Sequence, residues 1–166
     1  MSDPNGLIQP GRIAPGFTLP ATPDGALVGP EQFRGRPVVL AFYPADWSPV
    51  CGDQMSLYQS AAPVFAQYQA VVLGVSVDSI WSHRAFAESK GIEFPLLSDF
   101  EPKGEVARRY GAYLPQRGEA ARALVVLDPA GTVTWSYLSP PDVNPGADGI
   151  FDALDQLAAD RKVMAG

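Results

Sequence analysis

The chain has 166 residues, of which 46% are hydrophobic, and a formal net charge of −6. This length and composition allow one domain with a buried core, which we expect over residues 1–166, and the negative charge argues against a general nucleic-acid or anionic-membrane surface. No apolar stretch approaches the roughly 20 residues that span a bilayer, and residues 1–11 lack the basic start and apolar core of a secretory signal, so we expect a cytoplasmic protein.

The first part of the chain leads to a buried strand. Residues 1–10 are polar and rich in proline and glycine, and we expect a loosely held arm there. Residues 17–19 and 26–28 are short strand candidates on either side of a turn-forming triplet at 23–25. The run over residues 37–43 is continuously apolar and rich in β-branched and aromatic side chains, which is typical of a strand buried on both faces.

A helix should follow this strand. Ser48 and Pro49 mark its start, with serine as the N-cap residue and proline in the first helical position, and it should reach about Ser60. Pro63 then kinks or restarts it. A second buried strand is expected over residues 71–77, and a strand–helix–strand unit predicts parallel strands joined by a right-handed crossover.

The second half of the chain alternates helices and strands. The expected elements are a helix at 81–90, an extended segment at 94–99, a helix at 101–110, strands at 122–127 and 132–138 joined by a turn at 128–131, and a closing amphipathic helix over about 148–161. Ser79 is a possible cap for the first of these helices and Gly91 its stop. Together with the first half, this order predicts an α/β thioredoxin-like fold.

The chain contains one cysteine, Cys51, and one histidine, His83. A single cysteine excludes an internal disulfide, a Cys-x-x-Cys redox pair and a thiolate-rich metal site. A single histidine leaves little for a zinc site, and no acidic cluster has suggestive spacing. We therefore expect no metal and no cofactor.

Cys51 falls at the third position of the helix that begins after Ser48. Pro44 ends the preceding strand because it has no amide hydrogen for a sheet. First-turn amides lack partners within the helix, and the helix dipole adds partial positive charge there. Helix N-termini lower the pKa of cysteine from about 8.5 to between about 3.5 and 7.5, so a reactive thiolate is expected, and a buried structural cysteine is the alternative.

Several motifs resemble the peroxiredoxins, a family of thiol-dependent peroxidases. The segment Pro44-x-x-x-Ser48-x-x-Cys51 is similar to their Pro-x-x-x-Thr/Ser-x-x-Cys signature. Further similar segments lie at 14–19, 33–37, 83–86, 94–99 and 122–128, in the usual order. The resemblance covers roughly residues 10–160 and is strongest to the one-cysteine alkyl hydroperoxide reductase E type. It implies a thioredoxin-like fold with additional N-terminal strands and an inserted helix.

The resemblance also implies a reaction and its partners. Hydrogen peroxide or an organic hydroperoxide would oxidise Cys51 to a sulfenic acid, and an external thiol would resolve it, since the sequence offers no second cysteine. The reductant would be a low-molecular-weight thiol or a thioredoxin- or mycoredoxin-like protein. We also expect a homodimer, because aromatic residues cluster near the Cys51 loop.

Three residues are expected to assist Cys51. Ser48 has a hydroxyl within reach of a bound peroxide, although its role could be that of an N-cap alone. Arg122 precedes an apolar strand and could be an ordinary strand-end arginine, but it matches the active-site arginine of the family, which would stabilise the thiolate and bind peroxide oxygens. Pro44 would shield the sulfur. We expect Cys51, Ser48 and Arg122 to converge on one small cavity reached from solvent.

Three further residues flank this site. Trp47 and Tyr43 would line a pocket for organic peroxides or form a subunit contact, with burial in the core as the alternative, particularly for Tyr43. Gln54 stands where many relatives have glutamate, and its amide could still hydrogen-bond the arginine.

Two other functions use the same residues. Cys51 could serve a non-catalytic redox sensor or scaffold that is oxidised without turnover. It could also act in a cysteine hydrolase with His83 as the general base, although the sequence offers no residue to orient that histidine.

Overall fold

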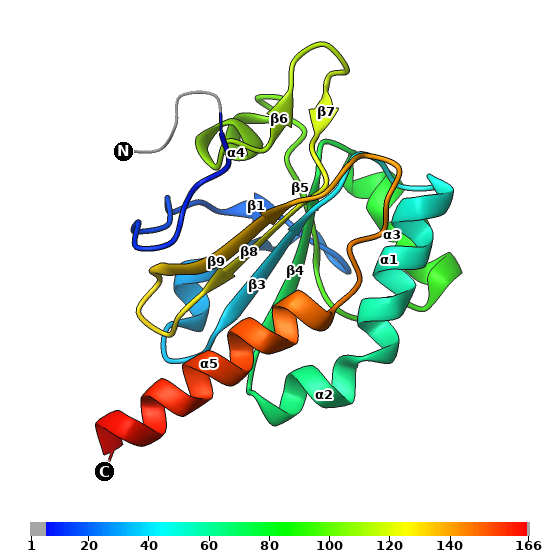
Figure 1. Cartoon of the computed structure of the whole chain (residues 1–166). Coiled ribbons are helices and arrows are strands. Elements are labelled where there is room, and N and C mark those ends of the chain that lie inside the picture. Colours follow the sequence, from blue (N-terminus) through cyan, green and yellow to red (C-terminus); the bar gives the residue numbers. More distant parts are fainter. Residues whose placement is uncertain (1–5, 166) are drawn as a thin grey trace.

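The computed structural model describes residues 6–165 of the chain, and it is organised around a mixed sheet with helices on both faces (Figure 1). The order across the sheet is β5 (Leu96–Ser98), β4 (Val71–Ser76), β3 (Val38–Phe42), β8 (Ala123–Leu127) and β9 (Val133–Leu138). The central strand, β3, is parallel to β4 and antiparallel to β8. The buried central strand and its parallel neighbour are as predicted.

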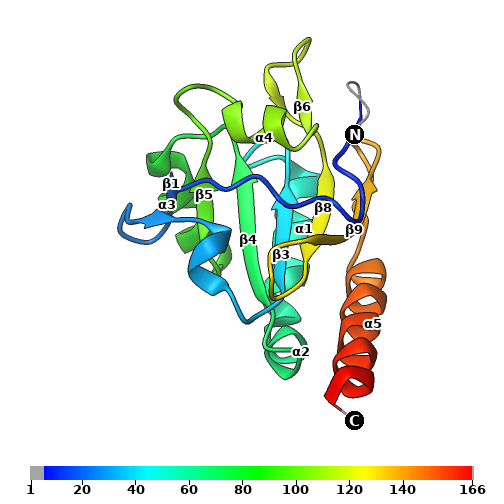
Figure 2. The ribbon, with the colours of Figure 1, turned by 90° about the vertical axis from the view of Figure 1, so that its left-hand side faces the viewer.

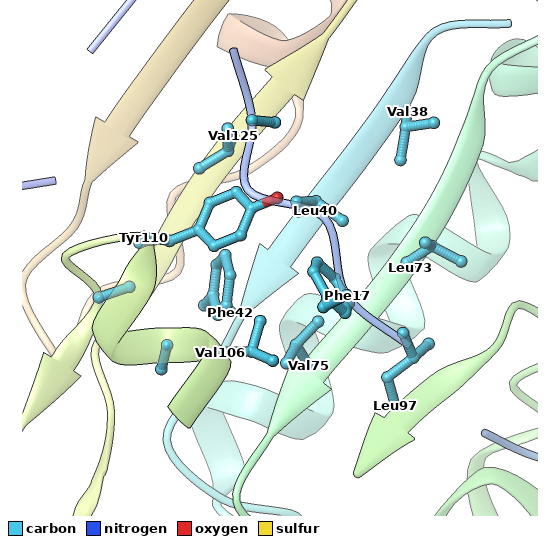
Figure 3. Packing of buried hydrophobic residues seen from close by; sticks show 14 of the residues in the cluster. Phe17, Val38, Leu40, Phe42, Leu73, Val75, Leu97, Val106, Tyr110 and Val125 are labelled. Atoms are coloured by element: carbon cyan, nitrogen blue, oxygen red, sulfur yellow. The ribbon is translucent and has the colours of Figure 1, made fainter. Parts of the chain in front are cut away.

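Strand β3 is buried throughout because both faces of the sheet are covered. Val38, Leu40 and Phe42 belong to a core beneath the N-terminal segment and α4 (Glu105–Arg109), in which Phe17, Val106 and Tyr110 also pack (Figure 3). Val39 and Ala41 face the opposite core. Since side chains alternate along a strand, one apolar run supplies both cores.

The helices α1 (Pro49–Ser60), α2 (Ala62–Gln67), α3 (Ile80–Lys90) and α5 (Asp148–Ala165) contribute to the second core (Figures 1 and 2). The break between α1 and α2 lies next to Pro63, where a kink or restart was predicted. Ser79 caps α3 by accepting a hydrogen bond from the Ser82 amide, and Gly91 ends it in a left-handed conformation. Both end signals of α3 were therefore interpreted correctly.

Short elements complete the fold. They are β1 (Leu19–Pro20) paired antiparallel with β2 (Leu27–Val28), the 3-10 helix η1 (Pro30–Phe33), and an unexpected antiparallel pair, β6 (Tyr113–Leu114) with β7 (Glu119–Ala120). None of the helices in the described part of the chain is long and apolar enough to cross a membrane.

Two predictions need correction. Residues 1–5 of the expected loose arm lie outside the described residues, but Leu7 and Ile8 are buried in the first core, and the Ile8 amide donates to the carbonyl of Tyr110. The helix expected over 101–110 is limited to α4, which starts only at Glu105.

The late start of α4 has a local cause. Gly104 has a φ of 70°, a left-handed conformation that interrupts an α-helix. The Asp99 carboxylate accepts hydrogen bonds from the amides of Val106 and Ala107, as an N-cap side chain would. The Asp99 side chain therefore caps the first turn of α4 although Asp99 lies outside that helix.

Candidate active site

The candidate site lies at the edge of the sheet where β3, β4 and β5 end and where the antiparallel β8 begins. The register pairs Phe42, the last residue of β3, with Ala123, the first residue of β8. Tyr43, which follows β3, and Arg122, which precedes β8, therefore lie at the same edge. The loop over residues 43–48 leaves β3 here and leads into α1. Chain topology thus brings together residues that are far apart in the sequence.

Cys51 is the third residue of α1, as predicted, and Ser48 is the N-cap residue. The cysteine is completely buried, with 0% exposure, in the core that also contains Met55 and Tyr58. No hydrogen bond joins Sγ to another of the residues 6–163. The expectation of a cavity that reaches the sulfur from solvent is therefore wrong for this structure, because apolar side chains cover that part of α1.

Among the described residues, the Ser48 hydroxyl takes part in no hydrogen bond. Its carbonyl accepts the amide of Gly52 over 2.8 Å, which begins the helical hydrogen bonding, but its side chain forms no capping bond. Ser48 is partly exposed and Pro44 is buried. The serine thus holds the backbone position of a cap while its Oγ remains able to bind a ligand.

Arg122 is almost completely buried, with 1% exposure, and is held against α1. Its Nη1 donates to Oε1 of Gln54 over 2.8 Å, and its Nε donates to the carbonyl of Pro141 over 2.9 Å. Gln54 follows Cys51 by three residues, so both lie on one face of α1. The predicted hydrogen bond between Gln54 and the arginine is present.

Gln54 also connects Arg122 to Tyr58. The amide nitrogen of Gln54 donates to the Tyr58 hydroxyl over 3.0 Å, and that hydroxyl donates to the carbonyl of Gly146 over 2.9 Å. Burial raises the pKa of Tyr58 to about 12, and the hydrogen bond from Gln54 and the charge of Arg122 oppose this rise. Tyr58 therefore stays a neutral donor at physiological pH.

A second buried network holds the loop before α1. The Asp46 carboxylate accepts hydrogen bonds from the Tyr43 hydroxyl (2.7 Å) and the Ser82 hydroxyl (2.9 Å), and it lies 2.8 Å from Nδ1 of His83. The Asp46 amide donates to Asp78 over 2.8 Å. This network ties the loop to α3 and to the end of β4.

Tyr43 and His83 are both at 0% exposure within this network. Tyr43 occupies the core position given above as its alternative, and burial with the neighbouring Asp46 carboxylate raises its pKa well above the ordinary value. Both ring nitrogens of His83 are engaged, Nδ1 with Asp46 and Nε2 with the carbonyl of Leu97 at 3.0 Å. Neither nitrogen is free to take a proton from Cys51, so the structure does not support a hydrolase with His83 as the base.

Asp46, Asp78 and His83 bring potential metal-ligating atoms within 4.8 Å of one another. These atoms already bind each other or neighbouring donors, since Nδ1 of His83 contacts Asp46 and Asp78 accepts the Asp46 amide. Their arrangement is that of a hydrogen-bonded network.

Trp47 stands apart from the other loop residues. It is 54% exposed, and its ring packs edge-on against Phe86 with centroids 5.4 Å apart. Its φ is 71°, in the left-handed region that is strained for a bulky side chain, at a cost of about 1–3 kcal/mol. The loop is therefore held in a conformation that its sequence does not favour locally.

The sequence analysis missed Asp46 and Asp78 as members of the site. A signal for both was present, because each carboxylate lies in the loop that follows a buried parallel strand. The carboxyl ends of parallel strands meet at one edge of the sheet, so these side chains could have been expected near the start of α1.

Comparison with known proteins agrees with this geometry. The model of the AhpC/TSA family matches residues 10–136, a range that includes Cys51, Ser48 and Arg122. The chain belongs to the peroxiredoxin family. As a peroxiredoxin it is a thiol-dependent peroxidase by class, and the thioredoxin-like α/β fold predicted from its sequence is confirmed.

Curated relatives show the extent of the similarity. Alkyl hydroperoxide reductase E of Mycobacterium tuberculosis is 32% identical over 154 residues, which cover 92% of this chain and 100% of the relative. Peroxiredoxin tpx1 of Schizosaccharomyces pombe is 33% identical over 89% of this chain and 81% of its own length. A relative from Entamoeba histolytica is 38% identical over 79% of this chain, which spans only 60% of that longer protein.

Solved peroxiredoxin structures have the same fold. The reduced 2-Cys peroxiredoxin of Plasmodium vivax superposes with a TM-score of 0.83 at 28% identity, over 92% of this chain and 83% of that one. Peroxidoxin BcpB of Mycobacterium tuberculosis gives a TM-score of 0.78 at 28% identity, over 92% of this chain and 97% of that one.

Proposed function

We propose that this peroxiredoxin reduces hydrogen peroxide and organic hydroperoxides by a one-cysteine mechanism centred on Cys51. The Cys51 thiolate attacks one peroxide oxygen, the O–O bond breaks, and the departing oxygen takes a proton to leave as water or an alcohol. Cys51 becomes a sulfenic acid. The arrangement that supports this proposal is a lone cysteine in the first turn of α1 with a free serine hydroxyl before it and a buried arginine against the same helix face.

Ser48 and Arg122 supply the two interactions that the reaction needs. Ser48 Oγ, which is not used as a cap, binds a peroxide oxygen and orients it for attack. Arg122 stabilises the charge that develops on the oxygens in the transition state, which is the larger contribution in most enzymes. Pro44, buried beside the loop, limits the access of water to the sulfur.

The burial of Cys51 adds a step before the chemistry. With Sγ at 0% exposure, a peroxide reaches the sulfur only when the surrounding side chains open. The partly exposed Trp47 and Ser48 lie at the outer side of this region, so we place the entry route at the loop before α1. In this proposal Trp47 contacts organic peroxides, and Gln54 keeps Arg122 in place.

An external thiol completes the cycle. One thiol condenses with the sulfenic acid, releasing water and forming a mixed disulfide, and a second thiol restores Cys51 and leaves as the disulfide of the reductant. A low-molecular-weight thiol or a thioredoxin- or mycoredoxin-like protein in a reducing compartment such as the cytoplasm would serve.

Stopped-flow oxidation of the reduced protein by hydrogen peroxide and by an alkyl hydroperoxide tests the proposal. We expect a rate well above that of free cysteine, loss of the reaction in Cys51→Ser, and a sulfenic acid that a dimedone probe traps. Ser48→Ala should lower the rate by about 10–100-fold, whereas the matched Ser48→Thr keeps the hydroxyl and most of the rate. A wild-type rate equal to that of free cysteine would refute the proposal.

The buried position of Cys51 favours one alternative, a redox sensor that is oxidised without turnover, because a covered sulfenic acid is shielded from a large reductant. Peroxide consumption with glutathione, mycothiol, thioredoxin and mycoredoxin separates the two functions. Continuous turnover with any of these thiols supports the peroxidase. Rapid oxidation with no turnover by all of them supports the sensor.

We also propose a homodimer that pairs through the edge carrying the Cys51 loop. Trp47 is 54% exposed and Trp81, at the start of α3, is 73% exposed. Exposed aromatic residues of this size are typical of protein–protein contacts. Light scattering that shows only a monomer at micromolar concentrations would contradict this proposal.

A further inference from the structure

Several hydrogen bonds of a single residue, Asp46, hold the loop before α1 in place. Its carboxylate contacts three donors, the hydroxyls of Tyr43 and Ser82 and Nδ1 of His83, and its amide donates to Asp78. The side chains of Asp46 and His83 are both at 0% exposure. A buried carboxylate with this many partners has one orientation only.

Both ring nitrogens of His83 have a hydrogen-bond partner. Nε2 of His83 lies 3.0 Å from the carbonyl oxygen of Leu97, which accepts only, so Nε2 carries a hydrogen. Nδ1 lies 2.8 Å from Oδ2 of Asp46, an oxygen that also accepts from Ser82, so a second proton lies between Nδ1 and Oδ2. A hydrogen bond with this shared proton therefore joins the two side chains directly.

This pair stands directly beside the strained residue of the loop. Trp47, with its φ of 71°, follows Asp46 and precedes Ser48. A bulky residue keeps a left-handed backbone only where neighbouring contacts impose it. The contacts of Asp46 are of that kind, because they attach the loop to α3, to the end of β4 and, through His83, to β5.

We propose that Asp46 and His83 are positioning residues for peroxide reduction. They hold the loop in its strained conformation and so direct the Ser48 hydroxyl and the first turn of α1 at the bound peroxide, without touching the peroxide themselves. This inference rests on the proposed peroxidase function, since it assigns a role in orienting the substrate of that reaction. It also accounts for a buried hydrogen-bonded pair that the chemistry at Cys51 does not use.

Two reactions of Cys51 separate positioning from general stability. Oxidation by hydrogen peroxide needs the oriented loop, whereas alkylation by iodoacetamide reports on the thiolate and its exposure without a peroxide-binding site. Asp46→Ala and His83→Phe remove the contacts that hold the loop. Both should lower the peroxide rate constant by about tenfold or more while changing the alkylation rate far less.

Conservative variants provide the matched control. In Asp46→Asn the side-chain oxygen still accepts from Tyr43. The amide nitrogen donates to Nδ1 of His83 and to the Ser82 hydroxyl, which turns to accept, so the loop stays attached to α3. We expect this variant to keep most of the peroxide rate. Ser82→Ala removes one donor to Asp46 at a partly exposed residue and should lower the peroxide rate constant by less. Near-ultraviolet circular dichroism shows whether Asp46→Ala folds. If it does not, Ser82→Ala carries the test.

The outcomes are distinct. A selective loss of the peroxide rate in the disruptive variants, with recovery in Asp46→Asn, supports the positioning role. Peroxide and alkylation rates that fall in parallel, an Asp46→Ala or Ser82→Ala protein with the wild-type peroxide rate, or no recovery in Asp46→Asn would overturn it. Failure of the proposed function itself is recognised separately, because the wild-type protein would then react with peroxide no faster than free cysteine.

Discussion

Arg122 and Gln54 form a buried hydrogen bond in which Nη1 of the arginine donates to Oε1 of the glutamine over 2.8 Å. Arg122 directly precedes β8 and Gln54 lies in α1, so the bond joins the antiparallel half of the sheet to the helix that carries Cys51. Both residues are buried, with exposures of 1% and 0%. Since the glutamine is neutral, it orients the guanidinium without cancelling its charge.

Gln54→Leu should therefore damage both stability and reactivity. It removes the acceptor of a buried guanidinium and the donor to Tyr58, and we expect the free energy of unfolding in urea to fall by about 2–3 kcal/mol. Displacement of Arg122 should lower the peroxide rate constant by about tenfold. Gln54→Glu, which retains an acceptor for Arg122, is the control and should keep most of that rate. Wild-type stability and rate in Gln54→Leu would contradict a role for this bond.

Tyr58 gives a prediction about alkaline stability. Burial raises the pKa of Tyr58 to about 12 from its ordinary value of 10.0. A raised pKa means that the native state holds the proton more tightly than the unfolded state. This contribution to stability is fully present below the unfolded pKa and is lost as the pH rises through the folded pKa.

Tyr58→Phe should thus flatten the dependence of stability on pH in the alkaline range. For the wild type, we expect Tyr58 alone to lower the free energy of unfolding by about 1 kcal/mol between neutral pH and about pH 11. Urea unfolding of both proteins at neutral and alkaline pH measures this difference. The variant loses the hydrogen bond to Gly146 at every pH, so the slope with pH is the quantity to compare. Equal slopes would argue against the raised pKa.

The elements predicted most accurately from the sequence were those whose signal is local. The apolar runs at 37–43 and 71–77 gave the buried strands, and Ser79 with Gly91 gave the ends of α3. The start of α4 was misplaced because an Asp99 carboxylate from outside the helix binds its first amides. No local pattern reveals such a partner.

The sequence predicted one contact of the candidate site but little of its environment. The expected contact between Gln54 and Arg122 is present, whereas the catalytic roles of Cys51, Ser48 and Arg122 stay predictions. The burial of Cys51 was given only as the alternative, and the network of Asp46 with His83 was not foreseen. Both depend on side chains from separate elements that meet only in the folded chain. Motif spacing places a nucleophile, whereas its accessibility is a tertiary property.

Asp99 provides a direct test of the explanation for α4. It is 1% exposed and accepts hydrogen bonds from the amides of Val106 (3.1 Å) and Ala107 (2.9 Å). Asp99→Ala leaves two buried amides without partners, so we expect the free energy of unfolding to fall by about 2–4 kcal/mol. Asp99→Asn retains one acceptor and should lose about half as much. Hydrogen exchange should speed up at these two amides, and unchanged protection in Asp99→Ala would show that other groups satisfy them.

The burial of Cys51 predicts that reagent size controls its reaction. A large aromatic disulfide cannot reach a sulfur with 0% exposure unless the site opens. Labelling of the native protein should therefore be slower than labelling of the urea-unfolded chain by about tenfold or more. Each 1.4 kcal/mol needed to open the site slows labelling by a factor of about ten. Hydrogen peroxide is small enough to enter through a much smaller opening, and its reaction should remain faster than that of free cysteine. Free cysteine and the unfolded chain are the controls for both reagents. Labelling of the native protein at the rate of the unfolded chain would show that the sulfur is open in solution, and the entry step proposed for the loop before α1 would then be unnecessary.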